Sequence, residues 1–149
     1  MCHYVSACKT KMEILFRMQK RVIRIITMSS YRNHSIPLFR ECRLLTLQEI
    51  HAYKIILFMF KVYHKIAPET FHACIIKNNE IHNYGTRYSH ELRVPPYKLS
   101  IMKQLWCVKG VYMWNFVCKY ITHDCSQNSF KISLRRFIIG NNDIPNIVP

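Results

Sequence analysis

Glycine and acidic residues are both scarce in this chain of 149 residues, which has 3 glycines and 8 aspartates and glutamates in total. Three scattered glycines cannot form the glycine-rich phosphate loops or the serine nucleophile turn of the common enzyme families. The two aspartates, Asp124 and Asp143, lie in a polar linker and a tail, and no close pair of carboxylates suits two-metal catalysis. We therefore expect neither a catalytic residue nor a cofactor in this chain.

Long hydrophobic runs are also missing. The longest unbroken apolar run, Ile55 to Phe60, has six residues, whereas a membrane-spanning helix needs about 20. The first ten residues lack the apolar stretch of about 7–15 residues that defines a signal peptide. We expect no membrane span and no secretion, and we place the chain inside the cell, in the cytoplasm or the nucleus.

The seven cysteines form no C-x2-C pair, and their odd number does not suit a complete disulfide framework. The nearest constellation for a metal has spacing that matches no common zinc pattern and consists of Cys118, His123 and Cys125, with Cys107 as a fourth candidate. We expect no metal site. Buried free cysteines behave as small hydrophobic residues, and this is our interpretation of Cys42, Cys74, Cys107 and Cys118.

Basic residues are abundant, with 22 lysines and arginines and a formal net charge of +14. Residues 1–65 carry 12 basic and 3 acidic side chains, and no run of five or more like charges occurs. The excess must therefore lie on folded faces rather than on a disordered basic tail. Such a charge favours phosphate polymers as partners, and anionic membrane surfaces after them.

Residues 9–28 are predicted to form an amphipathic helix, because they contain neither proline nor glycine and show helical spacing. The apolar residues of its stripe, which we expect to face a core, are Ile14, Leu15, Met18, Val22, Ile25 and Ile26. The basic residues, which fall in a separate stripe at about 100° per residue, are Arg17, Lys20, Arg21 and Arg24. This second stripe must face either water or phosphate.

A second helix is predicted to begin after Thr46, because Thr46 and Glu49 have the spacing of a capping box. It continues to about Lys65, and its middle is apolar all round, so we expect it to be the central, most buried helix. A short helix is predicted to start at Ala67-Pro68-Glu69 and to reach about Ile76.

The rest of the chain alternates between irregular and helical patterns. Residues 78–98 contain turn-forming residues and are predicted to be a loop with room for a short extended piece. Residues 99–121 have helical spacing interrupted by Gly110, so one helix and two short ones are equally compatible with the pattern. A last helix is predicted from Ser129, as its N-cap, to about Ile139, where Gly140 ends it.

Together these patterns predict a mainly α protein, a small bundle of about four to six helices. The segment near residues 78–98 is expected to be irregular and is compatible with a short β-strand. The expected layout is an N-terminal tail at residues 1–8, one helical domain at 9–139 and a C-terminal tail at 140–149.

Several segments, taken in order, resemble one protein family. They are Gln19-Lys20-Arg21-Val22-Ile23-Arg24-Ile25-Ile26, Tyr31-Arg32, Pro37-Leu38-Phe39, Leu44-Leu45-Thr46-Leu47, Phe58 to Tyr63, Ala67-Pro68-Glu69, His82-Asn83-Tyr84-Gly85-Thr86-Arg87, Gly110, Trp114-Asn115, Ser129-Phe130-Lys131 and Leu134-Arg135. Over residues 12–139 this succession is similar to the C-terminal region, thumb and post-thumb, of reverse transcriptases from non-LTR (LINE-like, jockey-type) retrotransposons. The chain departs from the family at Val111, where proline is common, and at Phe116-Val117, where Leu-Pro is common.

The resemblance implies that the parent is an RNA-directed DNA polymerase whose palm and endonuclease precede this region. A thumb and tail hold template and primer by the backbone, which calls for lysine and arginine on helix faces. The residues expected to contact RNA or DNA are Arg17, Lys20, Arg21, Arg24, Arg32, His82, Tyr84 and Arg87. His82 and Tyr84 would stack on bases or contact sugars, although His82 is as well suited to pinning its own loop. The absent polymerase domain is a further expected partner, and the oligomeric state is open.

A second hypothesis starts from the amphipathic helix predicted for residues 9–28. A basic amphipathic helix also binds anionic membrane surfaces or acidic helical partners. The two hypotheses differ in what they require of Leu15, Met18 and Val22, because side chains buried in the core cannot also enter lipid.

Overall fold

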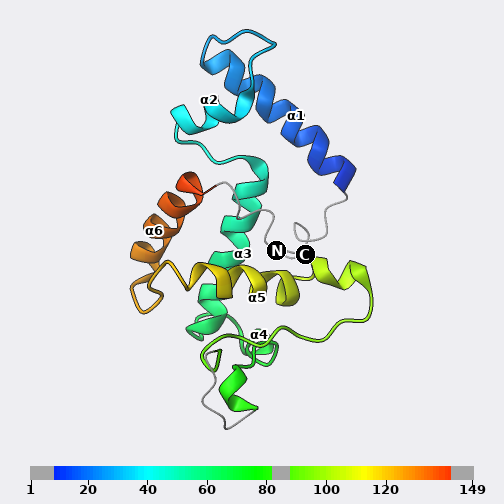
Figure 1. Ribbon diagram of the computed structural model, residues 1–149, viewed down its shortest axis with the longest axis vertical. Coiled ribbons are helices and arrows are strands. Elements are labelled where there is room, and N and C mark those ends of the chain that lie inside the picture. Colours follow the sequence, from blue (N-terminus) through cyan, green and yellow to red (C-terminus); the bar gives the residue numbers. More distant parts are fainter. Residues whose placement is uncertain (1–8, 82–87, 142–149) are drawn as a thin grey trace.

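The computed structural model describes residues 9–81 and 88–141, and it is mainly helical (Figure 1). Within those residues the elements, in chain order, are α1 (Lys9–Ile26), α2 (Ser35–Glu41), α3 (Leu47–Tyr63), α4 (Glu69–His72), the 3-10 helix η2 (Asn78–Glu80), the 3-10 helix η3 (Ser100–Gln104), α5 (Trp106–Val117) and α6 (Gln127–Gly140). The expected small helical bundle is confirmed.

Helix α3 runs through the middle of the molecule and packs against α1, α4, α5 and α6 (Figure 1). Its predicted capping box is present. The Thr46 hydroxyl accepts a hydrogen bond from the Glu49 amide at 3.4 Å, and the Thr46 amide donates to the Glu49 carboxylate at 2.7 Å. Ile56 and Met59, in its apolar middle, have no solvent exposure. The prediction of a central, buried helix that begins after Thr46 is therefore confirmed.

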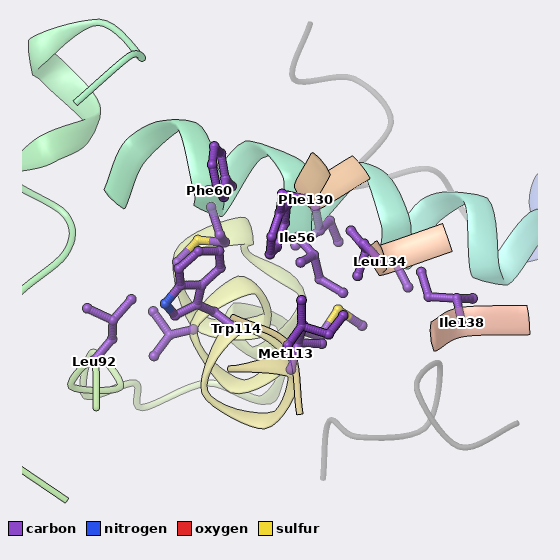
Figure 2. Close-up of a cluster of buried hydrophobic side chains, with 14 residues drawn as sticks. Ile56, Phe60, Leu92, Met113, Trp114, Phe130, Leu134 and Ile138 are labelled. Atoms are coloured by element: carbon purple, nitrogen blue, oxygen red, sulfur yellow. The ribbon is translucent and has the colours of Figure 1, made fainter. Parts of the chain in front are cut away.

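The core lies where α3, α5 and α6 meet (Figure 2). The rings of Phe60 on α3 and Phe130 on α6 stack with centroids 4.4 Å apart, and Trp114 on α5 meets the Phe130 ring at 5.9 Å. Leu134 and Ile138 extend the same cluster along α6 (Figure 2). Helix α3 and the two helices α5 and α6, which lie much later in the sequence, thus share one set of buried aromatic and aliphatic side chains.

Gly110 lies inside α5 and does not interrupt it. The helical pattern of residues 99–121 is instead divided at Leu105, which is extended (φ −63°, ψ 141°) between η3 and α5. A Cβ atom built at Gly110 would lie 2.8 Å from the Sδ atom of Met59 and 3.3 Å from Cγ2 of Ile55. The absence of a side chain at Gly110 therefore lets α5 approach α3 closely.

Several predicted helix boundaries differ from the observed ones. Helix α4 stops at His72 rather than near Ile76. Helix α6 begins earlier than predicted, because Ser126 is its N-cap and its hydroxyl accepts from the Ser129 amide at 3.3 Å. Ser129 is therefore not the cap. The helix does end at Gly140, but the next residue, Asn141, has φ −121°, so no left-handed glycine cap forms.

The irregular segment near residues 78–98 contains η2 and an isolated antiparallel bridge between Lys77 and Leu92, with no longer strand in its described part. Asn115 of α5 anchors this segment. Its side-chain amide donates to the Leu92 carbonyl oxygen at 2.8 Å, and its carbonyl oxygen accepts from the Leu92 amide at 3.0 Å. The Asn115 side chain thus pairs with the Leu92 backbone as a neighbouring β-strand would, and it holds the irregular segment against α5.

The scarcity of glycine is visible at helix C-termini. Met28, Arg43 and Lys65 have φ of 52°, 51° and 56°, and each is the second residue after its helix. After α3, for example, the Ile66 amide donates to the Lys61 carbonyl oxygen at 2.8 Å, which closes a Schellman motif. Glycine normally occupies this left-handed position, so three larger residues here adopt a strained backbone conformation.

Candidate nucleic-acid interface on helix α1

Helix α1 carries four of the eight predicted nucleic-acid contacts, and three of the four share one face. Arg17, Arg21 and Arg24 are spaced by four and three residues, which places them on one face, within about 10 Å of rise. No carboxylate in the described part of the chain forms an ion pair with any of the three. Lys20 lies toward the edge of this face, where its Nζ is 4.2 Å from the centroid of the Phe16 ring. The face therefore offers positive charge to an external anion.

Arg24 also organises the loop that comes after α1. Its Nε donates to the Asn33 carbonyl oxygen at 3.0 Å, and its guanidinium carbon lies 5.7 Å from the centroid of the Tyr31 ring. Arg32 lies between these two loop residues in sequence and is exposed. Arg24 thereby ties the loop that carries Arg32 to the basic face of α1.

The rotation of α1 about its own axis is set by Gln19. The Gln19 amide donates to the Leu45 carbonyl oxygen at 3.0 Å, and its side-chain oxygen accepts from the Leu47 amide at 2.8 Å. This double hydrogen bond joins α1 to the first residue of α3. It turns Ile23, which is one helical turn further along and 1% exposed, into the interior.

The predicted burial of the apolar stripe on α1 is wrong. The stripe residues are all exposed, with Leu15 at 46%, Met18 at 57% and Val22 at 52% among the set Ile14, Leu15, Met18, Val22, Ile25 and Ile26. The physical reason is the rotation imposed by Gln19, because at about 100° per residue Ile23 and Gln19 lie at one edge of the stripe. The helix packs through that edge, and the centre of the stripe faces outward.

A groove lies beside this exposed stripe, where α1 meets the other elements of the same end of the molecule. It encloses a cavity of about 320 Å³ whose lining is almost entirely apolar. The walls are contributed by four helices and one linker, and they include Val22, Ile26, Phe39, Leu44, Ile50 and Arg135.

His82, Tyr84 and Arg87, the second group of predicted nucleic-acid contacts, lie outside the described residues. The chain on either side of them is described. The Asn78 amide donates to the Glu91 carbonyl oxygen at 3.1 Å, and the Asn78 side chain donates to the Tyr88 carbonyl oxygen at 2.9 Å. The contribution of His82, Tyr84 and Arg87 to a binding site stays a prediction.

Three residues form structural contacts that were not anticipated from the sequence. Gln19 and Asn115 fall in two of the segments that carry the family resemblance, and both use their amides to hold backbone rather than a ligand. Arg40 forms an ion pair with the buried carboxylate of Glu49 at 2.5 Å and also donates to the Ile138 carbonyl oxygen at 3.4 Å. A polar residue at the edge of an apolar helical pattern was the signal for Gln19, but its backbone partner cannot be read from spacing.

Cys118 is poorly suited to bind a metal or to act as a nucleophile, because its thiol is held protonated. Within residues 9–81 and 88–141, no three His, Cys, Asp or Glu side chains are grouped to hold a metal ion. Burial, with smaller contributions from the charges of Asp124 and Glu91, raises the pKa of the Cys118 thiol to about 12, whereas ligation and attack require the thiolate. Cys74 is exposed, which corrects the expectation that it is a buried hydrophobic residue.

No helix in the described part of the chain is both long enough and apolar enough to cross a membrane. No family model, curated protein or solved structure matches the chain. Its function is therefore inferred from its own residues and from the resemblance of its sequence motifs.

Proposed function

We propose that this chain is the nucleic-acid-holding C-terminal region of a retrotransposon-encoded, RNA-directed DNA polymerase of the non-LTR type, without the catalytic palm. The observation that carries the proposal is the face of α1 on which Arg17, Arg21 and Arg24 lie together without carboxylate partners among the described residues. The proposed family rests on the ordered sequence motifs. The proposed partner is the polymerase domain of that family, and the proposed location is the cytoplasm or the nucleus.

Binding of this kind needs positive charge at fixed spacing more than it needs base-reading groups, since contacts to the phosphate backbone supply most of the sequence-independent affinity. The arginines of α1 meet that need, because a guanidinium can form two parallel hydrogen bonds to one phosphate. Arg24 and its contact to the Asn33 carbonyl oxygen would keep Arg32 within the same basic surface. The proposed chemistry is therefore backbone binding to RNA or DNA.

Fluorescence polarisation with labelled single-stranded RNA and duplex DNA, repeated over a range of salt concentrations, tests this proposal. Each phosphate contact contributes a log–log salt slope of about 0.9 on duplex DNA. If Arg17 and Arg21 each contact a phosphate, the variant Arg17→Ala/Arg21→Ala should weaken binding and reduce the slope by about 1.8 on duplex DNA. Both side chains are exposed, so the variant should fold normally.

The matched control removes two exposed lysines away from α1, in the variant Lys61→Ala/Lys98→Ala. This control lowers the net charge by the same amount, so it should change the slope far less if α1 is the interface. Equal slope changes in the two variants would mean that only the total charge matters. Failure of the unmodified chain to bind either nucleic acid at low salt would overturn the proposal.

A second candidate function is that of a basic module that binds anionic membrane surfaces or acidic partners through α1. The observation that favours it is the exposure of Leu15, Met18 and Val22, since these side chains are free to enter lipid or a partner. Co-sedimentation with vesicles, with and without anionic lipid, tests the membrane form. Binding that depends on anionic lipid and is lost on replacing Leu15 by glutamine would support it, and absence of binding to both kinds of vesicle would exclude it.

A further inference from the structure

The exposed apolar stripe of α1 and the groove beside it form one continuous surface, which we name the α1 groove. Val22 and Ile26 belong to both, because they are exposed on α1 and also line the cavity. The far wall is made by Phe39 of α2, Leu44 of the linker after α2 and Ile50 of α3. Figure 1 shows α1, α2 and the first turns of α3 together at one end of the molecule.

The dimensions of this surface suit a helix. Helix α1 has 18 residues and is therefore about 27 Å long. Its exposed apolar side chains, from Ile14 to Ile26, recur over about 18 Å of that length at the spacing of one helical face, next to a cavity of about 320 Å³ that can receive side chains. A helix lying along α1 would bury the stripe and place apolar residues at positions i, i+3, i+4 and i+7 into the recess. Contiguous apolar surface of this kind marks an interaction site.

The charge around the α1 groove selects the partner. Arg135 is the only charged side chain among the described residues that line the cavity. The exposed side chain of Lys11 lies at the N-terminal end of the apolar stripe, one turn before Leu15, and that of Arg21 lies beside the stripe, one turn before Ile25. A partner with carboxylates beside its apolar residues would complement these cations. A second copy of this chain would instead bring another net charge of +14 to the same place.

The shape of the α1 groove favours a protein helix over a lipid surface. An interfacial helix enters a membrane through a convex apolar face. Here the apolar side chains of Val22 and Ile26 lie beside walls contributed by Phe39 and Ile50, so part of the surface is recessed. A flat bilayer would cover the outer stripe and leave this recess unfilled, whereas a helix can insert side chains into it.

We propose that the α1 groove binds an amphipathic helix whose apolar face is flanked by acidic residues. The inference rests on the second candidate function, for which it names the partner, and it shares Arg21 with the proposed nucleic-acid face. The apolar face of the partner packs on Leu15, Val22 and Ile26, and its carboxylates pair with Lys11, Arg21 and Arg135.

The probe is a designed helical peptide of 18 residues with leucines at i, i+3, i+4 and i+7 spacing and glutamates on both flanks. Titration calorimetry with the full chain should give one-to-one binding. A scrambled peptide of the same composition, which has the same charge but no apolar stripe, should bind at least about tenfold more weakly. Equal binding of the two peptides would mean that charge alone is being measured, and it would overturn the proposal.

The variant Leu15→Gln/Val22→Gln removes apolar surface from the α1 groove without changing charge. Both side chains are about half exposed, so the fold is retained, which circular dichroism checks. We expect an affinity loss of about tenfold or more for the striped peptide. The matched control is Ile132→Gln, an equally exposed apolar residue on the solvent side of α6, which should bind normally. The proposal fails if Ile132→Gln weakens binding as much as the double variant does.

The remaining outcomes separate this inference from the function on which it rests. Binding to anionic vesicles without binding to the striped peptide would exclude a helical partner. It would leave the membrane-binding form of the second candidate function. Absence of binding to both would remove the second candidate as well. Dimerisation of the chain that is lost in Leu15→Gln/Val22→Gln would identify a second copy as the occupant, and this too would overturn the proposal.

Discussion

Replacing Gly110 by alanine adds one methyl group where α5 packs against α3. That methyl carbon would lie 2.8 Å from Met59 Sδ, 3.0 Å from Met59 Cγ and 3.3 Å from Ile55 Cγ2. Real Cβ atoms essentially never approach within 3.0 Å of a neighbour, so the Met59 side chain must move. Met59 has no solvent exposure, which leaves it little space in which to do so.

Two effects of opposite sign decide the result. Alanine in a helix interior is favoured over glycine by about 1 kcal/mol. Overpacking a well-filled core costs about 1–3 kcal/mol. Because the contact is with a buried sulfur and Ile55 Cγ2 is also close, we expect the steric cost to exceed the propensity gain. The net free energy of unfolding should fall by about 1 kcal/mol, which lowers the Tm by about 2–4 °C for a chain of this size.

Urea unfolding followed by tryptophan fluorescence measures this change, since Trp114 lies in the same core and is 2% exposed. A double-mutant cycle with Met59→Ala isolates the contact. Met59→Ala alone should cost about 2–5 kcal/mol, but in its background Gly110→Ala should become stabilising by up to about 1 kcal/mol. The expected coupling energy is therefore about 2 kcal/mol. Additive effects, or a stabilising Gly110→Ala in the unmodified chain, would refute the reasoning.

Four further predictions concern other parts of the molecule. Met28→Gly should raise the free energy of unfolding by about 0.5–1 kcal/mol, because glycine adopts the left-handed conformation without strain, while Met28→Ala should not. Asn115→Ala should lower it by about 1–3 kcal/mol and speed hydrogen exchange at the Leu92 amide, since both backbone groups of Leu92 lose their partner; unchanged exchange would contradict the proposed anchor. The exposed Cys74 should react with iodoacetamide before Cys118, whose raised pKa of about 12 keeps its thiol protonated. The pKa of Cys118 in the folded chain lies above its ordinary value, so the protonated thiol stabilises the fold. This stabilisation is present below about pH 9 and is lost as the pH rises toward 12. Urea unfolding at several pH values measures the loss.

Much of the secondary structure is set by local physics and was predictable. The capping box at Thr46 and Glu49 uses contacts within four residues, so the sequence pattern was enough to locate the start of α3. The start of α6 was missed because Ser126 and Ser129 are both competent caps, and the choice between them depends on which turn packs on the core. The extent of α5 was ambiguous because the cost of Gly110 is offset by the close packing of α5 on Met59.

The candidate site was predicted only in part. The positions of Arg17, Arg21 and Arg24 on one face are a consequence of helical spacing, so the basic face could be read from the sequence. The anchoring role of Arg24 could not, because its partner is a backbone carbonyl oxygen nine residues away. The α1 groove could not be predicted either, since its walls come from α1, α2, α3 and α6.

The sequence by itself determined that this chain is helical, strongly basic and poor in the residues of catalytic sites, because periodicity, charge and composition are local or additive properties. Only the tertiary structure decided which side of α1 faces inward. An amphipathic pattern states that an apolar stripe exists, but not what covers it. Here the two hydrogen bonds from Gln19 to the start of α3 turn Ile23 inward and leave Leu15, Met18 and Val22 exposed, because paired amide hydrogen bonds are directional and hydrophobic contact is not.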